Sequence, residues 1–278
     1  MTIAYTSFFV VGLLAAPNLS AHTTYGGTAR NLGVNQETTP GSGVFMPAAI
    51  SGASAALPYF KTITNQTVTS NFGWAAGTDV AYGDAHHIRA FRFTLAEAGY
   101  ATLNVTADST RGTAVGFSIM PAFSLYSGLL STGSADYDTA GITLAWLQTL
   151  GNPQPRNGAL NSLDDWKIGN DASLADGQGA YNFNELSSLA YIGNVADGTS
   201  ANFGAAAGVN GDGVADGSVQ QSYWLLSGDY TVIIGGAEIA ENNLMTFGIN
   251  ASLTVIPEPS STLMIGLAGL GLALRRRR

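Results

Sequence analysis

Hydrophobic and polar side chains alternate in two successive runs near the middle of the first half of the chain. Arg89–Leu95 alternates over seven residues, and Tyr100–Ala107 alternates in the same way. A period of two residues is typical of strands that bury one face. The short segment Glu97–Gly99 separates the runs and suits a tight turn, so they are predicted to pair as a β-hairpin.

The same alternation predicts further strands along the chain. They are expected at Val115–Met120, Phe123–Tyr126, Tyr223–Leu226, Tyr230–Ile234 and Met245–Val255. In the last strand five apolar side chains share one face, namely Phe247, Ile249, Ala251, Leu253 and Val255. Several strands with one dry face indicate an all-β fold, an antiparallel β-sandwich of jelly-roll-like type. Helical periodicity is limited to Leu144–Leu150 and Asn184–Tyr191, where short helices are expected.

Between the strand-rich blocks lies a long tract rich in Gly, Asn, Asp and Ser. We expect residues 131–222 to form an insertion into the sandwich, because so long an irregular segment is unusual inside a compact domain. The body is then residues 22–254. Its first part, residues 22–58, is poor in charge and is expected to supply one edge strand.

The N-terminus has the pattern of an export signal. Phe8–Ala16 is an apolar run of nine residues, too short to span a bilayer, and small residues before His22 suit cleavage after Ala21. Residues 1–21 are therefore predicted to be a signal peptide. The alternative is a buried N-terminal strand.

The C-terminus combines three elements in a fixed order. Pro257, Glu258 and Pro259 interrupt strand pairing, the apolar segment Ser261–Leu274 follows, and Arg275, Arg276, Arg277 and Arg278 end the chain. A helix of 14 residues is about 21 Å long, so arginines that snorkel to the interface would help it to span a thinned bilayer. The positive-inside rule places these arginines in the cytoplasm, so we expect a short transmembrane helix with the body outside.

This order of motif, apolar helix and arginine cluster resembles the PEP-CTERM sorting signal of Gram-negative bacteria. The resemblance covers residues 255–278 and implies export by the Sec route, transient anchoring in the inner membrane, and cleavage by an exosortase, a membrane cysteine protease. It further implies delivery to the outer surface or to an exopolysaccharide and biofilm matrix. The alternative is an ordinary tail anchor.

A second resemblance concerns the body. Four segments together resemble pre-peptidase C-terminal-like modules, which are small jelly-roll β-sandwiches of secreted proteins: Phe91–Leu95, Ala101–Val105, Pro121–Gly128 and Leu226–Val232. This resemblance implies a sandwich that assists export or ligand binding rather than catalysis.

Charge and cysteine content exclude several functions. Only 11% of the residues are charged, and the formal net charge is −8, but four of the eleven basic residues belong to the terminal arginine cluster. Residues 22–254 keep 7 basic and 18 acidic groups, a net charge of −11. So acidic a body argues against nucleic acid or an anionic lipid surface as partner. The absence of cysteine excludes disulfides, thiolate metal sites and cysteine nucleophiles.

One Gly/Asp-rich segment has the spacing of a calcium loop. Oxygen ligands at alternating positions and a glycine at the turn are offered by Asn210, Asp212, Gly213 and Asp216, and the segment resembles a fragment of a dockerin or thrombospondin-type repeat. Gly208 stands where such loops carry Asp, and Val219 takes the place of the closing carboxylate. We therefore expect weak calcium binding, with a Kd of about 1 mM, and no other cofactor. The alternative is a solvated Asp/Gly turn.

Other clusters of polar residues indicate a functional site less clearly than this loop does. Asp79, Asp84, His86 and His87 include residue types that ligate metals, although a surface hydrogen-bond cluster is the simpler interpretation. Carboxylate pairs at Asp136 with Asp138 and at Asp164 with Asp165 have the composition of a glycosidase site, but their separation is not set by sequence. Aromatic side chains outside the core could stack on a sugar ring. The candidates are Trp74, Trp146, Trp166, Tyr223 and Trp224.

No known catalytic motif is present in the sequence, which lacks a nucleophile elbow, a zinc-protease motif and a phosphate loop. We therefore expect a non-enzymatic exported surface or matrix protein. The alternatives are a carbohydrate-binding module, with or without calcium, and a secreted glycan-active enzyme.

Overall fold

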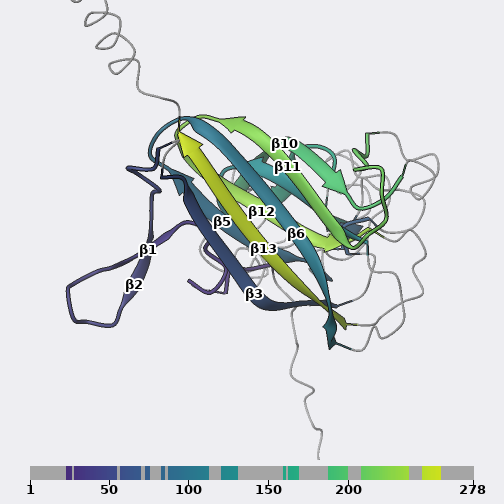
Figure 1. Ribbon diagram of the computed structural model, residues 1–278, viewed down its shortest axis with the longest axis horizontal. Coiled ribbons are helices and arrows are strands. Elements are labelled where there is room, and N and C mark those ends of the chain that lie inside the picture. Colours follow the sequence, from purple (N-terminus) through teal and green to yellow (C-terminus); the bar gives the residue numbers. More distant parts are fainter. Residues whose placement is uncertain are drawn as a thin grey trace, which may run out of the picture.

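Two antiparallel β-sheets packed face to face make up the body of the protein (Figure 1). The structure is a computed structural model and describes residues 23–26, 28–54, 57–69, 73–75, 83–84, 87–112, 120–130, 159–160, 162–168, 187–199, 208–237 and 246–257. Its regular elements are β-strands, so the predicted all-β, antiparallel sandwich is confirmed. Among these described residues, no helix is both long and apolar enough to span a bilayer.

One sheet has five strands and the other four. The five-stranded sheet has the order β5 (Arg89–Leu95), β12 (Gly228–Gly236), β7 (Pro121–Ser127), β10 (Ser187–Ala196) and β9 (Trp166–Ile168). The four-stranded sheet has the order β11 (Ser218–Leu225), β6 (Gly99–Gly112), β13 (Thr246–Pro257) and β3 (Tyr59–Thr69). Two small pairs complete the described strands: β1 (Val34–Glu37) with β2 (Phe45–Ala48), and β4 (Gly83–Asp84) with β8 (Ala159–Leu160).

The main core lies between the two sheets and follows from the alternation in the sequence. Phe91, Phe93 and Leu95 on β5 point inward, as do Leu103 and Val105 on β6. All five apolar residues expected on the inner face of the last strand, β13, are buried in the same cluster. Burial of these side chains supplies the main stabilisation of a fold that has no disulfide.

The five-stranded sheet is also covered on its outer face. Tyr126 on β7 and Ile233 on β12 point outward and pack with Leu160, Trp166 and Leu189 in a second buried cluster. The second strand of this sheet, β12, is therefore buried on both faces from Tyr230 onward. Its run of buried residues is continuous rather than alternating, as expected for a strand between two packed layers.

The predicted hairpin between Arg89–Leu95 and Tyr100–Ala107 is wrong. β5 pairs with β12, whereas β6 pairs with β11 and β13, so the turn between β5 and β6 crosses from one sheet to the other. The two strands belong to opposite sheets and are not paired with each other. Alternation identifies the buried face of a strand. It does not show whether the next strand pairs with that strand in the same sheet or belongs to the opposite sheet.

The expected helix at Asn184–Tyr191 is also wrong for the residues that the structure describes. Ser187–Ala196 forms β10, which pairs with β7 on one side and with β9 on the other. Leu189 lies opposite Trp166 and both side chains are buried, so ladder hydrogen bonds and burial override a weak local periodicity.

The tract expected as an insertion contributes strands to both sheets. β10 extends the five-stranded sheet and β11 forms one edge of the four-stranded sheet, although both begin within residues 131–222. The expected strand at Val115–Met120 and the expected helix at Leu144–Leu150 fall outside the described residues, except for Met120.

Residues 23–54 extend the edge of the five-stranded sheet beside β5. The Leu32 N–H donates to the Arg92 carbonyl at 2.8 Å, and the Ile50 N–H donates to the Thr94 carbonyl at 2.8 Å. These contacts lie on either side of the β1–β2 hairpin. The first part of the body therefore supplies edge pairing, as predicted, through two short contacts rather than one strand.

Gly99 is expected to be intolerant of any side chain. A Cβ at this position would lie 2.7 Å from the Ile256 carbonyl oxygen and 2.8 Å from the Pro257 Cα, both backbone atoms of β13. Gly99→Ala should therefore lower the free energy of unfolding by about 1–3 kcal/mol, as measured by denaturant titration. Glu97→Ala, at an exposed position of the same turn, is the comparison and should change it by about 0.5 kcal/mol or less. Equal stability of Gly99→Ala and the wild type would show that the end of β13 does not pack against β6 in this way.

Candidate metal centre

The end of β10 and the loop that precedes β11 lie side by side at one end of the sandwich. The Ala196 N–H donates to the Asn210 carbonyl at 2.9 Å, and the Asp212 N–H donates to the Ala196 carbonyl at 3.1 Å. Asp197, the residue after β10, donates its N–H to the Pro121 carbonyl at 2.9 Å. The two bonds of Ala196 fix the loop of residues 208–217 against the last residue of β10.

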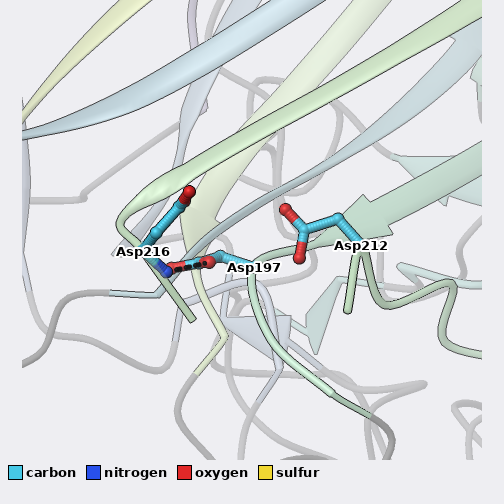
Figure 2. Close-up of side chains that lie close together, drawn as sticks. All are labelled: Asp197, Asp212 and Asp216. Atoms are coloured by element: carbon cyan, nitrogen blue, oxygen red, sulfur yellow. Dashed lines mark hydrogen bonds between the residues drawn. The ribbon is translucent and has the colours of Figure 1, made fainter. Parts of the chain in front are cut away.

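Three carboxylates converge where these segments meet. Asp197, Asp212 and Asp216 each offer one oxygen, and these oxygens all lie within 4.8 Å of one another (Figure 2). Asp197 is buried, whereas Asp212 and Asp216 are exposed on the loop. We call these three residues the aspartate triad.

Backbone N–H groups hold the buried carboxylate in place. Asp197 Oδ1 accepts a hydrogen bond from the Asp216 N–H at 2.9 Å, which Figure 2 marks, and Oδ2 accepts one from the Gly217 N–H at 2.8 Å. Burial raises the pKa of Asp197, and the negative charges of Asp212 and Asp216 raise it further, whereas the two N–H groups lower it. A cation placed among the triad would favour the ionised carboxylate that burial disfavours.

Local turn chemistry orients the two exposed carboxylates. Asp212 Oδ1 accepts from the Val214 N–H at 3.2 Å, and Asp216 Oδ1 accepts from the Ser218 N–H at 3.0 Å, both two residues ahead as in Asx turns. Gly213 and Gly217 follow the two aspartates with φ of 95° and 80°, a conformation that side chains disfavour. The Asp-Gly pairs therefore fold the loop and direct both carboxylates.

The geometry of the triad suits a hard divalent cation. Calcium takes carboxylate oxygens at about 2.3–2.6 Å, so two of its ligand oxygens lie at most about 5 Å apart. An all-carboxylate donor set favours calcium, magnesium or manganese over metals that prefer nitrogen or sulfur.

The structure brings together part of the set expected from sequence. Asp212 and Asp216 lie in the triad, but the Asn210 side chain contacts β10 instead, where its Nδ2 donates to the Asn194 carbonyl at 3.4 Å. Asp197 was not expected, because it lies on another segment. Its only sequence signal is the Asp-Gly pair at Asp197–Gly198, directly after an apolar run.

The other polar candidates are tied to the backbone or lie outside the described residues. Asp165 Oδ1 accepts from the Tyr191 N–H at 2.8 Å, and Asp164 Oδ1 accepts from the Asp165 N–H at 2.8 Å. His87 is half-buried. Outside the described side chains lie the remaining members of the expected clusters, namely Asp79, Asp84, His86, Asp136 and Asp138.

Most of the candidate aromatic residues belong to the core. Trp74 and Trp166 are buried, and Tyr223 points inward and packs edge to face against Phe123. Trp224 alone among those that the structure describes is exposed, with 43% of its surface accessible. Trp146 lies outside the described residues.

The tail begins where the sandwich ends. Pro257 is the last residue of β13 and lies opposite Gly99 at the end of the sheet, on the side away from the aspartate triad. The rest of the proposed sorting segment lies outside the described residues, namely Glu258, Pro259, Arg275, Arg276, Arg277 and Arg278.

Comparisons with known proteins found similar solved structures and one matching family model. No curated protein matches the sequence. One similar solved structure is that of CorA, a surface-associated copper-binding protein of Methylomicrobium album BG8. The sequence identity is 14% and the TM-score is 0.44, and the match covers 75% of this chain and 99% of that chain. MopE, a copper-binding secreted protein of Methylococcus capsulatus, is similar with 13% identity and a TM-score of 0.40, over 82% of this chain and 93% of that chain.

The match that bears on function is at the C-terminus. The family described as the PEP-CTERM protein-sorting motif matches residues 255–278, the segment that was predicted from the order of its three elements. This family covers the tail and the last three residues of β13, and it leaves the rest of the sandwich unmatched. The chain therefore carries a PEP-CTERM protein-sorting motif at residues 255–278, which supports export and processing by an exosortase.

Proposed function

We propose that this protein is a non-enzymatic component of the cell surface or exopolysaccharide matrix of a Gram-negative bacterium. Its tail holds it transiently in the inner membrane, and an exosortase then releases the sandwich. The low content of charged residues suits contact with neutral polymers. The PEP-CTERM match supports export and processing.

The observation that carries this proposal is the position of Pro257. This residue is both the last of β13 and the first proline of the sorting motif. Cleavage beyond it would leave every described strand in the released product. The sandwich and the sorting segment therefore share only residues 255–257, so the fold can remain intact after the tail is removed.

The experiment that tests the proposal is fractionation of the native host with mass spectrometry of the C-terminus. We expect a mature species in the outer-surface fraction that ends close to Glu258 and lacks the arginine cluster. A surface protein that retains Arg278 would overturn processing. A species confined to the inner membrane would instead support the ordinary tail anchor.

We further propose that the aspartate triad binds calcium weakly. The supporting observation is the convergence of a buried carboxylate with two exposed ones from a separate loop. Such a cation would join the end of β10 to the loop before β11, so its role would be structural. Matrix polysaccharide binding that requires calcium would instead identify a carbohydrate-binding module.

Calcium is expected to stabilise the protein against unfolding. With a Kd of about 1 mM, 10 mM calcium should add about 1.4 kcal/mol to the free energy of unfolding. Asp212→Asn should abolish this gain, because it removes one charged ligand while its Oδ1 can still accept the two N–H bonds from Gly198 and Val214. The measurement is denaturant unfolding with calcium or with a chelator.

A control variant with the same change in net charge distinguishes the loss of a calcium ligand from the loss of a negative charge. Asp229→Asn lies at the opposite end of the sandwich, where Asp229 Oδ1 accepts from Thr94 Oγ1 at 2.6 Å, and it should keep the full calcium response. Equal responses of wild type, Asp212→Asn and Asp229→Asn would show that calcium does not bind the triad.

The raised pKa of Asp197 predicts a pH dependence with a definite sign. In the metal-free protein the folded state holds the Asp197 proton more tightly than the unfolded state does. Stability should therefore fall as the pH rises from the ordinary range of an Asp carboxyl through the raised pKa. The calcium response should grow over the same range, because calcium binds the ionised carboxylate. A calcium response that does not change with pH would contradict the participation of Asp197.

A further inference from the structure

The outward face of the four-stranded sheet is polar over most of its length. Thr102 on β6 and Ser222 on β11 share a hydroxyl hydrogen bond of 2.7 Å, and Asn104 Nδ2 donates to Gln220 Oε1 at 3.3 Å. These residues are uncharged and alternate with the core residues of the same strands. Such a face is suited to water.

At one end of this face the polar pattern gives way to large apolar side chains. Trp224 lies opposite Tyr100, and Tyr100 lies opposite Ile256, so these residues form a row across β11, β6 and β13. Phe60 on β3 lies outside this row, opposite Thr254, which is two residues from Ile256 along β13. With two flanking leucines they form what we call the end patch, with exposed fractions of 76% for Leu57, 64% for Phe60, 56% for Tyr100, 43% for Trp224, 68% for Leu226 and 38% for Ile256.

The end patch lies where the sorting tail leaves the sandwich. Ile256 belongs to the patch and Pro257 follows it directly (Figure 1, end of β13). Only Glu258–Ser260 separate Pro257 from the apolar segment that begins at Ser261. A fully extended chain covers about 14 Å over these four steps, so a tail inserted in a bilayer would hold the patch beside its surface.

The chemistry of the end patch matches the boundary of a bilayer. Tryptophan and tyrosine favour the headgroup level, where one part of the ring is apolar and the other is wet, and aliphatic side chains enter the acyl boundary. The rings of Tyr100 and Trp224 meet edge to face, with centroids 4.9 Å apart and planes inclined by 66°. This inclination prevents the two rings from stacking together on one flat sugar chain, so the geometry favours lipid over polysaccharide.

We infer that the end patch rests on the lipid headgroup boundary of the membrane while the tail is inserted. This inference rests on the proposed anchoring of the precursor by its tail. The precursor then has two membrane contacts, and two contacts bind far more firmly than one. After the tail is removed, only the end patch contacts lipid, and this contact is reversible. The cleavage that ends anchoring therefore also permits release of the sandwich.

The patch also fixes the cleavage region near the bilayer. Contact through three adjacent strands orients the sandwich, since neighbouring strands lie about 4.8 Å apart and the row of Trp224, Tyr100 and Ile256 spans about 10 Å. Pro257 is then held at the membrane surface, within reach of a protease that is itself embedded in the membrane. Because the described residues of this row are uncharged, the contact needs no anionic lipid.

The test uses the full-length chain reconstituted in phosphatidylcholine and phosphatidylethanolamine vesicles that contain lipid brominated near the headgroup. Bromine quenches tryptophan only at close range, so we expect quenching in the wild type and loss of most of it in Trp224→Phe. Trp166→Phe, which changes a buried tryptophan of the other sheet, is the matched control and should keep the quenching. Added phosphatidylglycerol should not increase it.

Flotation of the same vesicles separates the two proposals. A chain that floats with the vesicles without quenching at Trp224 has an inserted tail and a patch in water, which overturns this inference alone. A chain that does not float overturns the anchoring and the inference together. Polysaccharide that shifts the Trp224 emission in the absence of vesicles, while vesicles do not, would reassign the patch to glycan binding.

Discussion

Replacing Pro257, Glu258 and Pro259 together with alanine should leave the full-length chain in the inner membrane with its tail attached. Pro257 is the last residue of β13, Glu258 and Pro259 precede the apolar segment, and the three residues provide the signature part of the matched sorting motif. Alanine permits the backbone to continue in a strand or helix, which proline prevents. The expected effect is a complete loss of tail removal, as followed by mass spectrometry of the C-terminus in each cell fraction.

A neighbouring triple substitution serves as the control. Ser260→Ala, Ser261→Ala and Thr262→Ala change the same number of residues directly after the motif and should leave processing intact. The sandwich itself should unfold at the same denaturant concentration in both variants, because the described strands end at Pro257. Normal trimming of the motif variant would contradict exosortase recognition of these residues.

Trp74→Ala should destabilise the sandwich more than the removal of any exposed side chain. Trp74 is fully buried, and its indole Nε1–H donates to Ser124 Oγ at 2.8 Å. Ser124 Oγ donates in turn to the Ser162 carbonyl at 2.6 Å, and Ser162 Oγ donates to the Trp74 carbonyl at 2.5 Å. This closed ring of bonds joins three segments on the outer side of the five-stranded sheet, so truncation leaves both a cavity and a polar group in need of a partner.

The expected cost is about 3–5 kcal/mol in the free energy of unfolding, measured by denaturant titration in the presence of a chelator. Trp224→Ala is the comparison, because this exposed side chain should cost about 1 kcal/mol or less. Similar losses in the two variants would show that the Trp74 ring is not a centre of packing. The stability should be the same with and without a reducing agent, since the chain has no cysteine.

The strands that the sequence predicts well are those with one wet face. Ile249 to Val255 alternates without interruption because this part of β13 has the core on one face and solvent on the other. β10 was missed because Asn194, Val195 and Ala196 are buried in succession, which hides a period of two. The crossing from β5 to β6 was missed for another reason: pairing depends on the whole sheet order and not on the turn.

The candidate sites also divide into those that the sequence predicts and those that it does not. The sorting tail was recognised because its function lies in the linear order of motif, apolar segment and arginines, which the sequence displays directly. Asp212 and Asp216 were found because they share one loop, whereas Asp197 reaches them only through the end of β10. The resemblance of the body to pre-peptidase C-terminal-like modules stays a prediction.

The position of β13 has a consequence for the time at which the sandwich can form. β13 is the last strand in the sequence, yet it lies between β6 and β3 and is the strand that joins β3 to its sheet. A chain that crosses a membrane N-terminus first cannot assemble this sheet until Pro257 has emerged, only four residues before the apolar segment. Until then β3 has no partner in its sheet, and the four-stranded sheet remains incomplete. Completion of folding and arrival of the tail at the membrane should therefore be nearly simultaneous.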